Sequence, residues 1–344
     1  MPDPVISIRD LAVEFRTDDG IVHAVDGLSY DVYAGETLGV VGESGSGKSV
    51  SWLSILGLIP TPPGRIVSGE ATFKGRDLLR LPQKERRRIR GGELTMVFQD
   101  PMTSLNPVLK VGDQVAEVIR AHNPRVKAGA ARRRVLELFR LVGIPSAERR
   151  LGQYPHEFSG GMRQRAMIAM AIANSPALLI ADEPTTALDV TIQAQILEVL
   201  KAAKQETHAA IVLITHDLGL IAELADRVVV MYAGRVVELG DVHTIFAAPR
   251  HPYTVGLMES LPRVSAEREW LTPIPGQPPS LINVPPGCPF HPRCFLSHGR
   301  TRCRTDVPPL RAIDGSRHLS ACHFAEELRG HEARPREAGV GAGA

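Results

Sequence analysis

The sequence predicts an α/β protein with a largely parallel sheet over its first 240 residues, followed by a small irregular extension. Three observations predict this fold. Short apolar runs rich in β-branched residues alternate with helical segments, as in parallel sheets. A glycine-rich loop joins an expected strand to an expected helix near residue 45. After Gly240 prolines become frequent, and all four cysteines lie between Cys288 and Cys322.

The overall composition excludes several classes of protein. The chain has 344 residues, 43% of them hydrophobic and 23% charged, which excludes global disorder. The 40 Lys and Arg nearly balance the 38 Asp and Glu, which argues against a dedicated nucleic-acid binder. No apolar run reaches the length of a membrane span, and residues 1–4 do not resemble a secretory signal. We therefore expect an intracellular, soluble chain.

The N-terminal region is expected to form strands. Within Val5–Val32, apolar residues alternate with polar ones, and residues 18–20 supply a turn; the apolar set is Ile6, Ile8, Val13 and Phe15. The short apolar run Thr37–Val41 predicts a buried strand, and Ser49–Leu58 predicts a helix that ends near Pro60.

The middle of the chain, about residues 100–157, is expected to be a helical insert. Val115–His122 and Arg132–Val142 show the spacing of amphipathic helices. Alternation of strands and helices then resumes. The expected strands are Ala177–Ala181, Ala210–Thr215, Arg227–Tyr232 and Arg235–Leu239, and the expected helices are Thr191–Lys204 and Leu218–Leu224.

The glycine-rich loop fits the phosphate-binding pattern G-x-x-x-x-G-K-[ST] over Gly42–Ser49. Lys48 is expected to reach the β- and γ-phosphates of a nucleotide, and the Ser49 hydroxyl to bind Mg²⁺. The helix that follows adds the positive end of its dipole. The remaining expected phosphate contacts are Gly42, Glu43, Ser44, Gly45, Ser46, Gly47 and Val50.

Two further strand ends carry polar residues suited to the same chemistry. Asp182 and Glu183 close the apolar run that starts at Leu178, and His216 follows the run Ala210–Thr215. We expect Asp182 to complete the Mg²⁺ shell, Glu183 to polarise an attacking water and His216 to contact the γ-phosphate. The alternatives are two exposed acids and a strand-capping histidine. The phosphate loop upstream favours the catalytic interpretation.

Several of these segments together resemble ABC-type ATPases. Ser159–Arg165 reads SGGMRQR and is similar to their signature motif, and Gln99 is similar to their Q-loop glutamine. Ala187–Asp189 resembles their D-loop, and His216 their switch histidine. The matches follow the family's order over about residues 5–240. The resemblance implies a P-loop NTPase fold with a RecA-like core, an antiparallel β subdomain and a helical subdomain near residues 100–160.

The resemblance also implies how ATP is bound and hydrolysed. Two cassettes would bind two ATP molecules head to tail, so that Ser159, Gly160 and Gly161 act on the partner's ATP. Further ATP contacts would come from Gln99, Asp189 and His216, and from Phe15 stacked on adenine; a core aromatic is the alternative for Phe15. Mg²⁺ would be held by Ser49, Gln99 and Asp182, with Lys48, Glu183 and His216 as catalytic residues. Phe158 and Met162 stand where the common motif has Leu and Gln, and Met162 is usual in one importer branch.

Other segments are similar to the ATPase subunits of dipeptide, oligopeptide and nickel importers. They are Gln99–Pro107, Phe158–Arg165, Asp217–Ile221 and His251–Thr254. The similarity implies an ATPase that energises peptide import, peripheral to the cytoplasmic face of the inner membrane. Its partners would be two membrane permease subunits, a second, paralogous ATPase and an extracytoplasmic peptide-binding protein.

The four cysteines are spaced Cys288-x₅-Cys294-x₈-Cys303-x₁₈-Cys322. In a reducing compartment such thiols favour a structural Zn²⁺ or an iron–sulfur cluster over disulfides. The spacing lacks the paired C-x₂-C of zinc ribbons, and Cys288–Cys294 resembles the C-terminal extension of the peptide importers. That resemblance implies a [4Fe–4S] cluster, with Zn²⁺ and four free thiols as alternatives. The extension would span residues 241–325, and 326–344 are expected to be a disordered tail.

A second function remains open at this point: a non-transport ABC ATPase whose cysteines form a zinc module that acts on nucleic acid. The near-neutral charge, the single cassette and the Gln99–Pro107 stretch favour the importer. We therefore expect no nucleic-acid partner.

Overall fold

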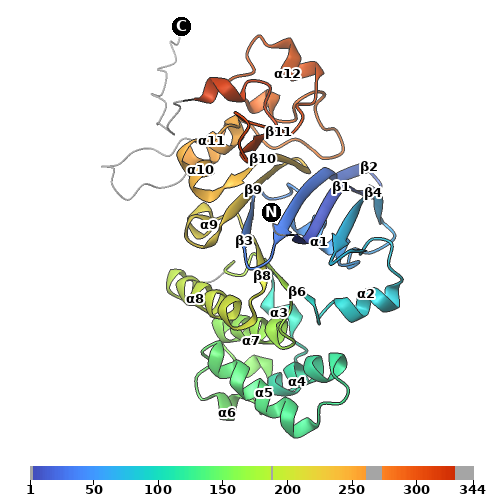
Figure 1. Ribbon diagram of the computed structural model, residues 1–344, viewed down its shortest axis with the longest axis vertical. Coiled ribbons are helices and arrows are strands. Elements are labelled where there is room, and N and C mark those ends of the chain that lie inside the picture. Colours follow the sequence, from blue (N-terminus) through green and yellow to red (C-terminus); the bar gives the residue numbers. More distant parts are fainter. Residues whose placement is uncertain (1–2, 187–188, 261–272, 330–344) are drawn as a thin grey trace.

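The computed structural model describes residues 3–186, 189–260 and 273–329, which form two sheets with helices around them (Figure 1). The smaller sheet is antiparallel and has the strand order β2-β1-β4-β5. Its strands are β1 (Pro4–Thr17), β2 (Gly20–Tyr33), β4 (Gly64–Phe73) and β5 (Arg76–Asp77). The predicted antiparallel subdomain is thus confirmed. The sequence analysis had not identified β4.

The larger sheet has the order β11-β12-β10-β9-β3-β8-β7-β6, and its members from β9 to β6 run parallel. The parallel strands are β3 (Thr37–Val41), β6 (Leu94–Val97), β7 (Leu178–Asp182), β8 (Ala210–Ile214) and β9 (Arg227–Tyr232), and β10 (Arg235–Asp241) pairs antiparallel with β9. Every residue of β3, β7 and β8 is buried, as expected of parallel strands covered on both faces. The predicted α/β fold is confirmed.

Helices cover the larger sheet and also build a separate helical region. Beside the sheet lie α1 (Lys48–Ile55), α8 (Val190–Thr207) and α9 (Leu218–Leu224). Between β5 and β7 the chain forms α2 (Gln83–Ile89), α3 (Pro101–Ser104), α4 (Val111–His122), α5 (Ala128–Leu141), α6 (Ala147–Arg150), η1 (Pro155–Glu157) and α7 (Gly160–Ile172). In Figure 1, α4, α5 and α6 extend below both sheets. Val115, Val135 and Phe139 are fully buried among these helices because apolar residues recur on one helical face.

The C-terminal region is more ordered than its proline content predicts. It contains α10 (Val242–Ala247), α11 (Pro252–Glu259), η2 (His291–Arg293), α12 (Thr301–Thr305), β11 (Arg311–Ala312), β12 (Leu319–Ser320) and η3 (Ala325–Leu328). Pro252 opens α11 at a position where a missing N–H costs nothing. The short β12 pairs with β10, so this region continues the larger sheet. Of the tail predicted at 326–344, residues 326–328 belong to η3, so disorder is wrong there, and the positions from 330 onward lie outside the described residues.

A buried carboxylate fastens the C-terminal region to β10. Glu238 is fully buried, and its Oε2 accepts the N–H of His251 at 3.1 Å. Its Oε1 lies 2.6 Å from Nε2 of His318. A buried carboxylate is costly unless it is paired, so these contacts fix both ends of the region to the sheet.

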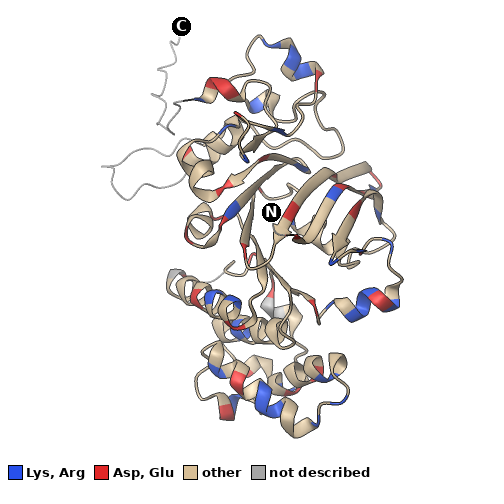
Figure 2. Cartoon of the chain, in the orientation of Figure 1, with Lys and Arg blue, Asp and Glu red and all other residues tan. Residues whose placement is uncertain are grey.

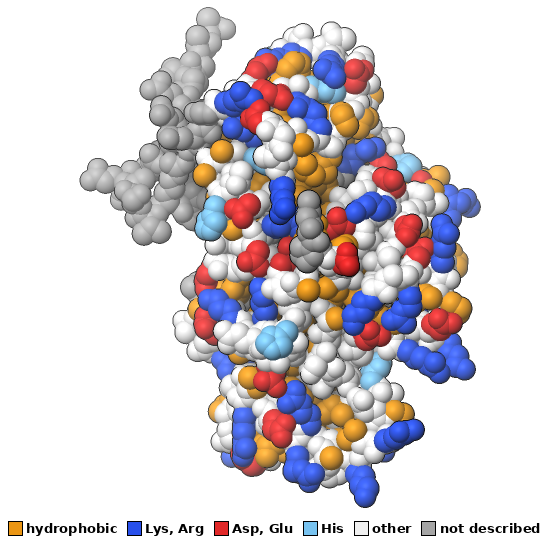
Figure 3. Space-filling model, viewed as in Figure 1, with side chains coloured by type: hydrophobic (Ala, Val, Ile, Leu, Met, Phe, Trp, Pro, Cys, Tyr) orange, Lys and Arg blue, Asp and Glu red, His pale blue; other side chains and the backbone are white. Residues whose placement is uncertain are grey.

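Charge is spread over the molecule. Basic and acidic residues both occur on the antiparallel sheet, on the helices and in the C-terminal region (Figure 2), and α2 carries a run of three arginines at its end: Arg86, Arg87 and Arg88. On the face shown in Figure 3, basic and acidic side chains are intermixed. Within the described part of the chain, no helix is both long and apolar enough to cross a membrane.

Candidate functional site

The loop between β3 and α1 has the backbone shape that its glycines allow. Gly42 and Gly47 have φ angles of 154° and 94°, which side chains rarely adopt. A Cβ at Gly42 would lie 2.2 Å from the carbonyl oxygen of Met231, and one at Gly47 would lie 2.3 Å from that of Ala24. Both positions therefore require glycine for two reasons: the backbone angle disfavours a side chain, and no space is left for a Cβ atom.

Gly47→Ala is expected to lower the free energy of unfolding by about 1–3 kcal/mol or more, because it adds backbone strain and a clash with backbone. The matched control is Gly129→Ala on α5, where nothing lies within 4 Å of the added Cβ. The control should be neutral or stabilise by up to about 1 kcal/mol. Denaturant unfolding measures both, and equal effects would contradict the constraint on the loop.

Lys48 lies across the inside of this loop. Its Nζ donates to the carbonyl oxygens of Gly42 at 2.7 Å and Glu43 at 2.9 Å, and the residue is only 5% exposed. Burial lowers the pKa of Lys48, while the nearby carboxylates of Glu183, Asp182 and Glu43 oppose that shift. The ammonium group is thus held at the mouth of the loop, within a cluster of acids.

Ser49 and Asp182 meet although 133 residues separate them. The Ser49 hydroxyl donates to Oδ1 of Asp182 at 2.7 Å, joining the start of α1 to the end of β7. Burial raises the pKa of Asp182, and the hydrogen bond from Ser49 partly offsets that effect. The pair presents two oxygen atoms of the kind that Mg²⁺ prefers. The chemistry of these donors therefore fits the predicted magnesium site.

Glu183 is the centre of a polar cluster just beyond β7. Its Oε2 accepts hydrogen bonds from Nε2 of Gln99 at 2.7 Å and from the Thr186 hydroxyl at 2.9 Å. Its Oε1 lies 3.5 Å from Nδ1 of His216. Three predicted site residues are thus brought together, while Thr186 was missed. The Gln99 amide nitrogen faces Glu183, not the Ser49–Asp182 pair, in this arrangement.

His216 and Glu183 differ in their exposure. The His216 side chain is 64% exposed and that of Glu183 is 18% exposed. The Glu183 backbone has a φ of 45°, a value rare for residues with a side chain, and its N–H donates to the carbonyl of Ile214 at 2.8 Å. The end of β8 therefore fixes the backbone that carries this carboxylate beside an accessible imidazole.

The predicted signature and D-loop residues lie at helix N-termini. Ser159 caps α7 by accepting the N–H of Met162 at 3.4 Å, and both Ser159 and Gly160 are exposed. Asp189 caps α8 by accepting the N–H of Ile192 at 2.9 Å. Ala187 and Leu188 lie outside the described residues. The exposed start of α7 offers free N–H groups and a positive dipole end to an anion.

The phosphate loop also meets the C-terminal region. A cavity of about 280 Å³ is bordered by residues 43–46 of the loop, and by Val22, Tyr232, Ala233, Pro278, Pro279 and Leu281. The sequence analysis did not place residues 278–281 beside the loop. Phe15 is half-buried on β1, paired with Val22 on one side and with Gly64 on the other. Val50 is half-buried on α1.

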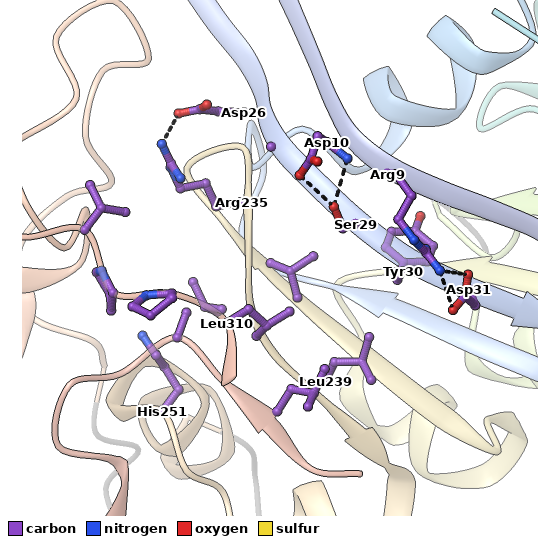
Figure 4. Close-up of a pocket in the computed structure, with 18 of the residues that line it drawn as sticks. Arg9, Asp10, Asp26, Ser29, Tyr30, Asp31, Arg235, Leu239, His251 and Leu310 are labelled. Carbon is purple, nitrogen blue, oxygen red and sulfur yellow. Dashed lines mark hydrogen bonds and ion pairs between the residues drawn. The ribbon is translucent and has the colours of Figure 1, made fainter. Parts of the chain in front are cut away.

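A second cavity, of about 900 Å³, separates the antiparallel sheet from the C-terminal region (Figure 4). Two ion pairs stand at its edge: Arg9 with Asp31, and Arg235 with Asp26. Cys288 and Phe290 contribute to its lining, whereas none of residues 42–49 does. It is therefore distinct from the space around the phosphate loop.

The four cysteines form no disulfide and lie in one small region. Cys294, Cys303 and Cys322 are buried and Cys288 is partly buried. The N–H of Cys288 donates to the carbonyl of Cys303 at 2.9 Å. Burial, assisted by the other cysteines, raises the pKa of Cys288 to about 11 and those of Cys294 and Cys322 to about 12. Within residues 3–186, 189–260 and 273–329, no three His, Cys, Asp or Glu side chains lie close enough to hold one metal ion.

Comparison with known proteins agrees with this geometry. A family model described as ABC transporter matches residues 25–186, and one described as oligopeptide/dipeptide transporter, C-terminal region, matches 237–303. The dipeptide transport ATP-binding protein DppD of Bacillus subtilis (strain 168) is 55% identical over 96% of this chain and 97% of its own. The oligopeptide transport ATP-binding protein OppD of Escherichia coli (strain K12) is 50% identical over 93% of both chains.

Among solved structures, the ATP-binding cassette MJ0796, as a dimer in a post-hydrolysis state with ADP and Pi, has a TM-score of 0.62 at 26% identity. The likeness covers 69% of this chain and 98% of that cassette. The sequence relatives span nearly the whole chain, the C-terminal region included. The chain therefore belongs to the family of ATP-binding subunits of oligopeptide and dipeptide ABC transporters.

Proposed function

We propose that this chain hydrolyses ATP to drive the uptake of di- or oligopeptides through separate membrane subunits. One observation supports the ATPase activity most directly. Five polar side chains gather around one glycine loop at the carboxyl edge of the parallel sheet: Lys48, Ser49, Asp182, Glu183 and His216. That edge is where open α/β sheets bind their ligands. The names of the relatives, dipeptide and oligopeptide transport proteins, support the substrate class.

Each residue of the cluster has a role in this proposal. Lys48 and the loop N–H groups would bind the β- and γ-phosphates. Ser49 and Asp182, with Gln99 at the edge of the cluster, would hold Mg²⁺, which supplies charge neutralisation at the phosphates. Water would attack the γ-phosphorus while the bond between that phosphorus and the ADP oxygen breaks. Glu183 would take the proton from the attacking water. His216 would hydrogen-bond the γ-phosphate, and Phe15 would stack on the adenine.

Two cassettes would share each ATP. We place Ser159, Gly160, Gly161 and Asp189 of one subunit against the ATP of the other. The exposed start of the 13-residue helix α7 supports this role, as does the dimeric state of the MJ0796 cassette. The partner would be a second, paralogous ATPase. The insert between Gln99 and Ser159, which contains α3–α6, would face two permease subunits at the cytoplasmic side of the inner membrane. An extracytoplasmic binding protein would deliver the peptide.

The proposal divides the chain into three parts. Residues 1–240 form the ATPase domain, with a helical subdomain at about 100–160. Residues 241–325 would form the C-terminal extension that carries the cysteines. The remainder, 326–344, would be the tail, although its first residues, 326–328, belong to η3. The pairing of β12 with β10 supports an extension that continues the ATPase sheet and folds together with it.

Peptide-stimulated hydrolysis tests the function. With both permeases and the partner ATPase in lipid vesicles, phosphate release is expected to rise when a peptide-loaded binding protein is added. Peptide should accumulate inside only when ATP and Mg²⁺ are supplied on the side of this subunit. Hydrolysis that responds to DNA or RNA and not to peptide would support a non-transport ATPase instead.

We further propose that the four cysteines hold a [4Fe–4S] cluster, with Zn²⁺ as the alternative. Cysteine thiolates are the ligands that both groups take. One Zn²⁺ would bring its sulfur atoms within about 4 Å of one another. The described cysteines influence one another's pKa, so their thiols lie near one another, although no three of the described His, Cys, Asp or Glu side chains form a group that fits a single ion. The cluster would stabilise a region that has little hydrophobic core of its own.

Metal analysis of protein purified without air distinguishes the alternatives. We expect a brown protein with about four iron and four sulfide per chain. Cys294→Ser, which removes one buried thiolate, should lower the iron content and the thermal stability. A colourless protein with one zinc per chain would contradict the cluster.

A further inference from the structure

Glu43 belongs to the phosphate loop, yet its side chain is held by the C-terminal extension. We infer that Arg293 is a positioning residue for this loop and couples the cysteine segment, Cys288–Cys294, to nucleotide affinity. The inference rests on the proposed ATP site. It does not depend on which metal the cysteines hold.

The contact between Arg293 and Glu43 is bidentate and buried. Nη1 of Arg293 lies 2.7 Å from Oε2 of Glu43, and Nη2 lies 2.9 Å from Oε1. The Arg293 side chain is only 5% exposed and that of Glu43 is 27% exposed. A fork-to-fork pair fixes orientation as well as distance, and limited access to water preserves its strength. Such a pair can hold a loop residue in one place.

Arg293 is itself held rigidly. Its Nε donates to the carbonyl of Pro275 at 3.0 Å, and its Nη1 lies 3.3 Å from the hydroxyl of Tyr232. Its guanidinium carbon is 5.8 Å from the centre of the Tyr232 ring and 5.9 Å from that of Phe290. These contacts immobilise the arginine before it meets Glu43, so little side-chain entropy is lost in making the pair.

A second group of the extension holds the Glu43 backbone. The hydroxyl of Tyr253, on α11, accepts the Glu43 N–H at 2.8 Å. Tyr253 is fully buried, with its ring centre 4.7 Å from that of Tyr232 and 5.4 Å from that of Phe290. The Glu43 carbonyl in turn accepts Nζ of Lys48 at 2.9 Å. Any shift of Glu43 would therefore move an acceptor of the phosphate-binding lysine.

The other end of this connection lies among the cysteines. Arg293 is in η2, between Cys288 and Cys294, and is followed directly by the latter. The N–H of Arg293 donates to the carbonyl of Phe290 at 3.0 Å, and that of Cys294 to His291 at 3.3 Å. Rearrangement of the cysteines would thus displace Arg293. Because coupling between two sites is reciprocal, nucleotide binding should also steady the cysteine segment.

Nucleotide affinity tests the inference on the full chain, with its metal content unchanged. We expect Arg293→Met to weaken the binding of a fluorescent ATP analogue with Mg²⁺ by about tenfold. Glu43→Gln keeps the size of the loop residue and should weaken it similarly, and the double variant should be no weaker than either single variant. Should Arg293→Met fail to fold, Glu43→Gln and Arg293→Lys provide the same comparison.

The matched control is Arg300→Met. Arg300 also belongs to the extension and makes a bidentate pair, with Glu327 at 2.9 and 2.8 Å, while stacking on Phe324. Its loss should leave the Kd for the analogue unchanged. An equal loss for Arg300→Met, or an unchanged Kd in folded Glu43→Gln, would overturn the inference.

Hydrogen exchange provides a second measurement, whose result would not change if Arg293 had only a structural role. Addition of the ATP analogue should slow amide exchange in residues 288–294 of the wild type, and this protection should be lost in Arg293→Met. Equal protection in both proteins would overturn the coupling. Failure of the wild type to bind any nucleotide would instead overturn the proposed function, so the two failures are distinguishable.

Discussion

Glu183→Gln is expected to bind ATP as tightly as the wild type while hydrolysing it about 10²- to 10⁴-fold more slowly. Glutamine has the same size and can still accept the hydrogen bonds of Gln99 and Thr186 through its amide oxygen. It cannot take a proton from the attacking water. The loss should therefore fall on turnover and leave nucleotide affinity intact.

Two measurements separate these effects: equilibrium binding of a fluorescent ATP analogue, and steady-state release of phosphate. The matched control is Glu206→Gln on α8, because Glu206 is an exposed carboxylate whose partner is Arg134. Its turnover should equal that of the wild type. Normal hydrolysis by Glu183→Gln would contradict the role of Glu183 as the residue that takes the proton from water.

Lys48→Ala is expected to weaken ATP binding by at least about 30-fold, equivalent to about 2 kcal/mol. The loss combines the missing ammonium charge with a loosened loop, because Lys48 ties the carbonyls of Gly42 and Glu43 together. Affinity and turnover should both fall, unlike the effect of Glu183→Gln. Titration calorimetry with ATP and Mg²⁺ provides the dissociation constant.

Lys201→Ala is the control for that measurement. Lys201 is a half-buried lysine on α8 paired with Glu198 and Glu223, away from the phosphate loop, so its removal should not change ATP affinity. Thermal unfolding of each variant checks that the fold is retained. Unchanged affinity in a folded Lys48→Ala protein would count against the phosphate loop.

The parts of the fold that could be predicted from the sequence are those with local signals. The strands β3 and β9 were predicted with the bounds that the structure has, since each is a short β-branched run flanked by polar or turn residues. The residues of the proposed site were found for a similar reason. Asp182 and His216 each follow an apolar strand, and parallel strands bring such ends to one edge of the sheet.

The rest depends on contacts that no local pattern encodes. The strands β11 and β12 have two residues each, too few to show any periodicity. The prolines after residue 240 predicted irregular structure, although Pro252 starts a helix. The pairing of Glu43 with Arg293 spans 250 residues, and nothing nearby in the sequence distinguishes Arg293 from the other arginines of the extension.

The measurement that tests the central claim most directly is peptide-dependent hydrolysis of ATP by the assembled importer. The complex is compared in vesicles with wild-type subunit and with Glu183→Gln, in the presence of a peptide-loaded binding protein. The account predicts that peptide raises phosphate release and drives peptide uptake with the wild type only. Equal phosphate release with and without peptide, or uptake that persists with Glu183→Gln in place of the wild type, would contradict it.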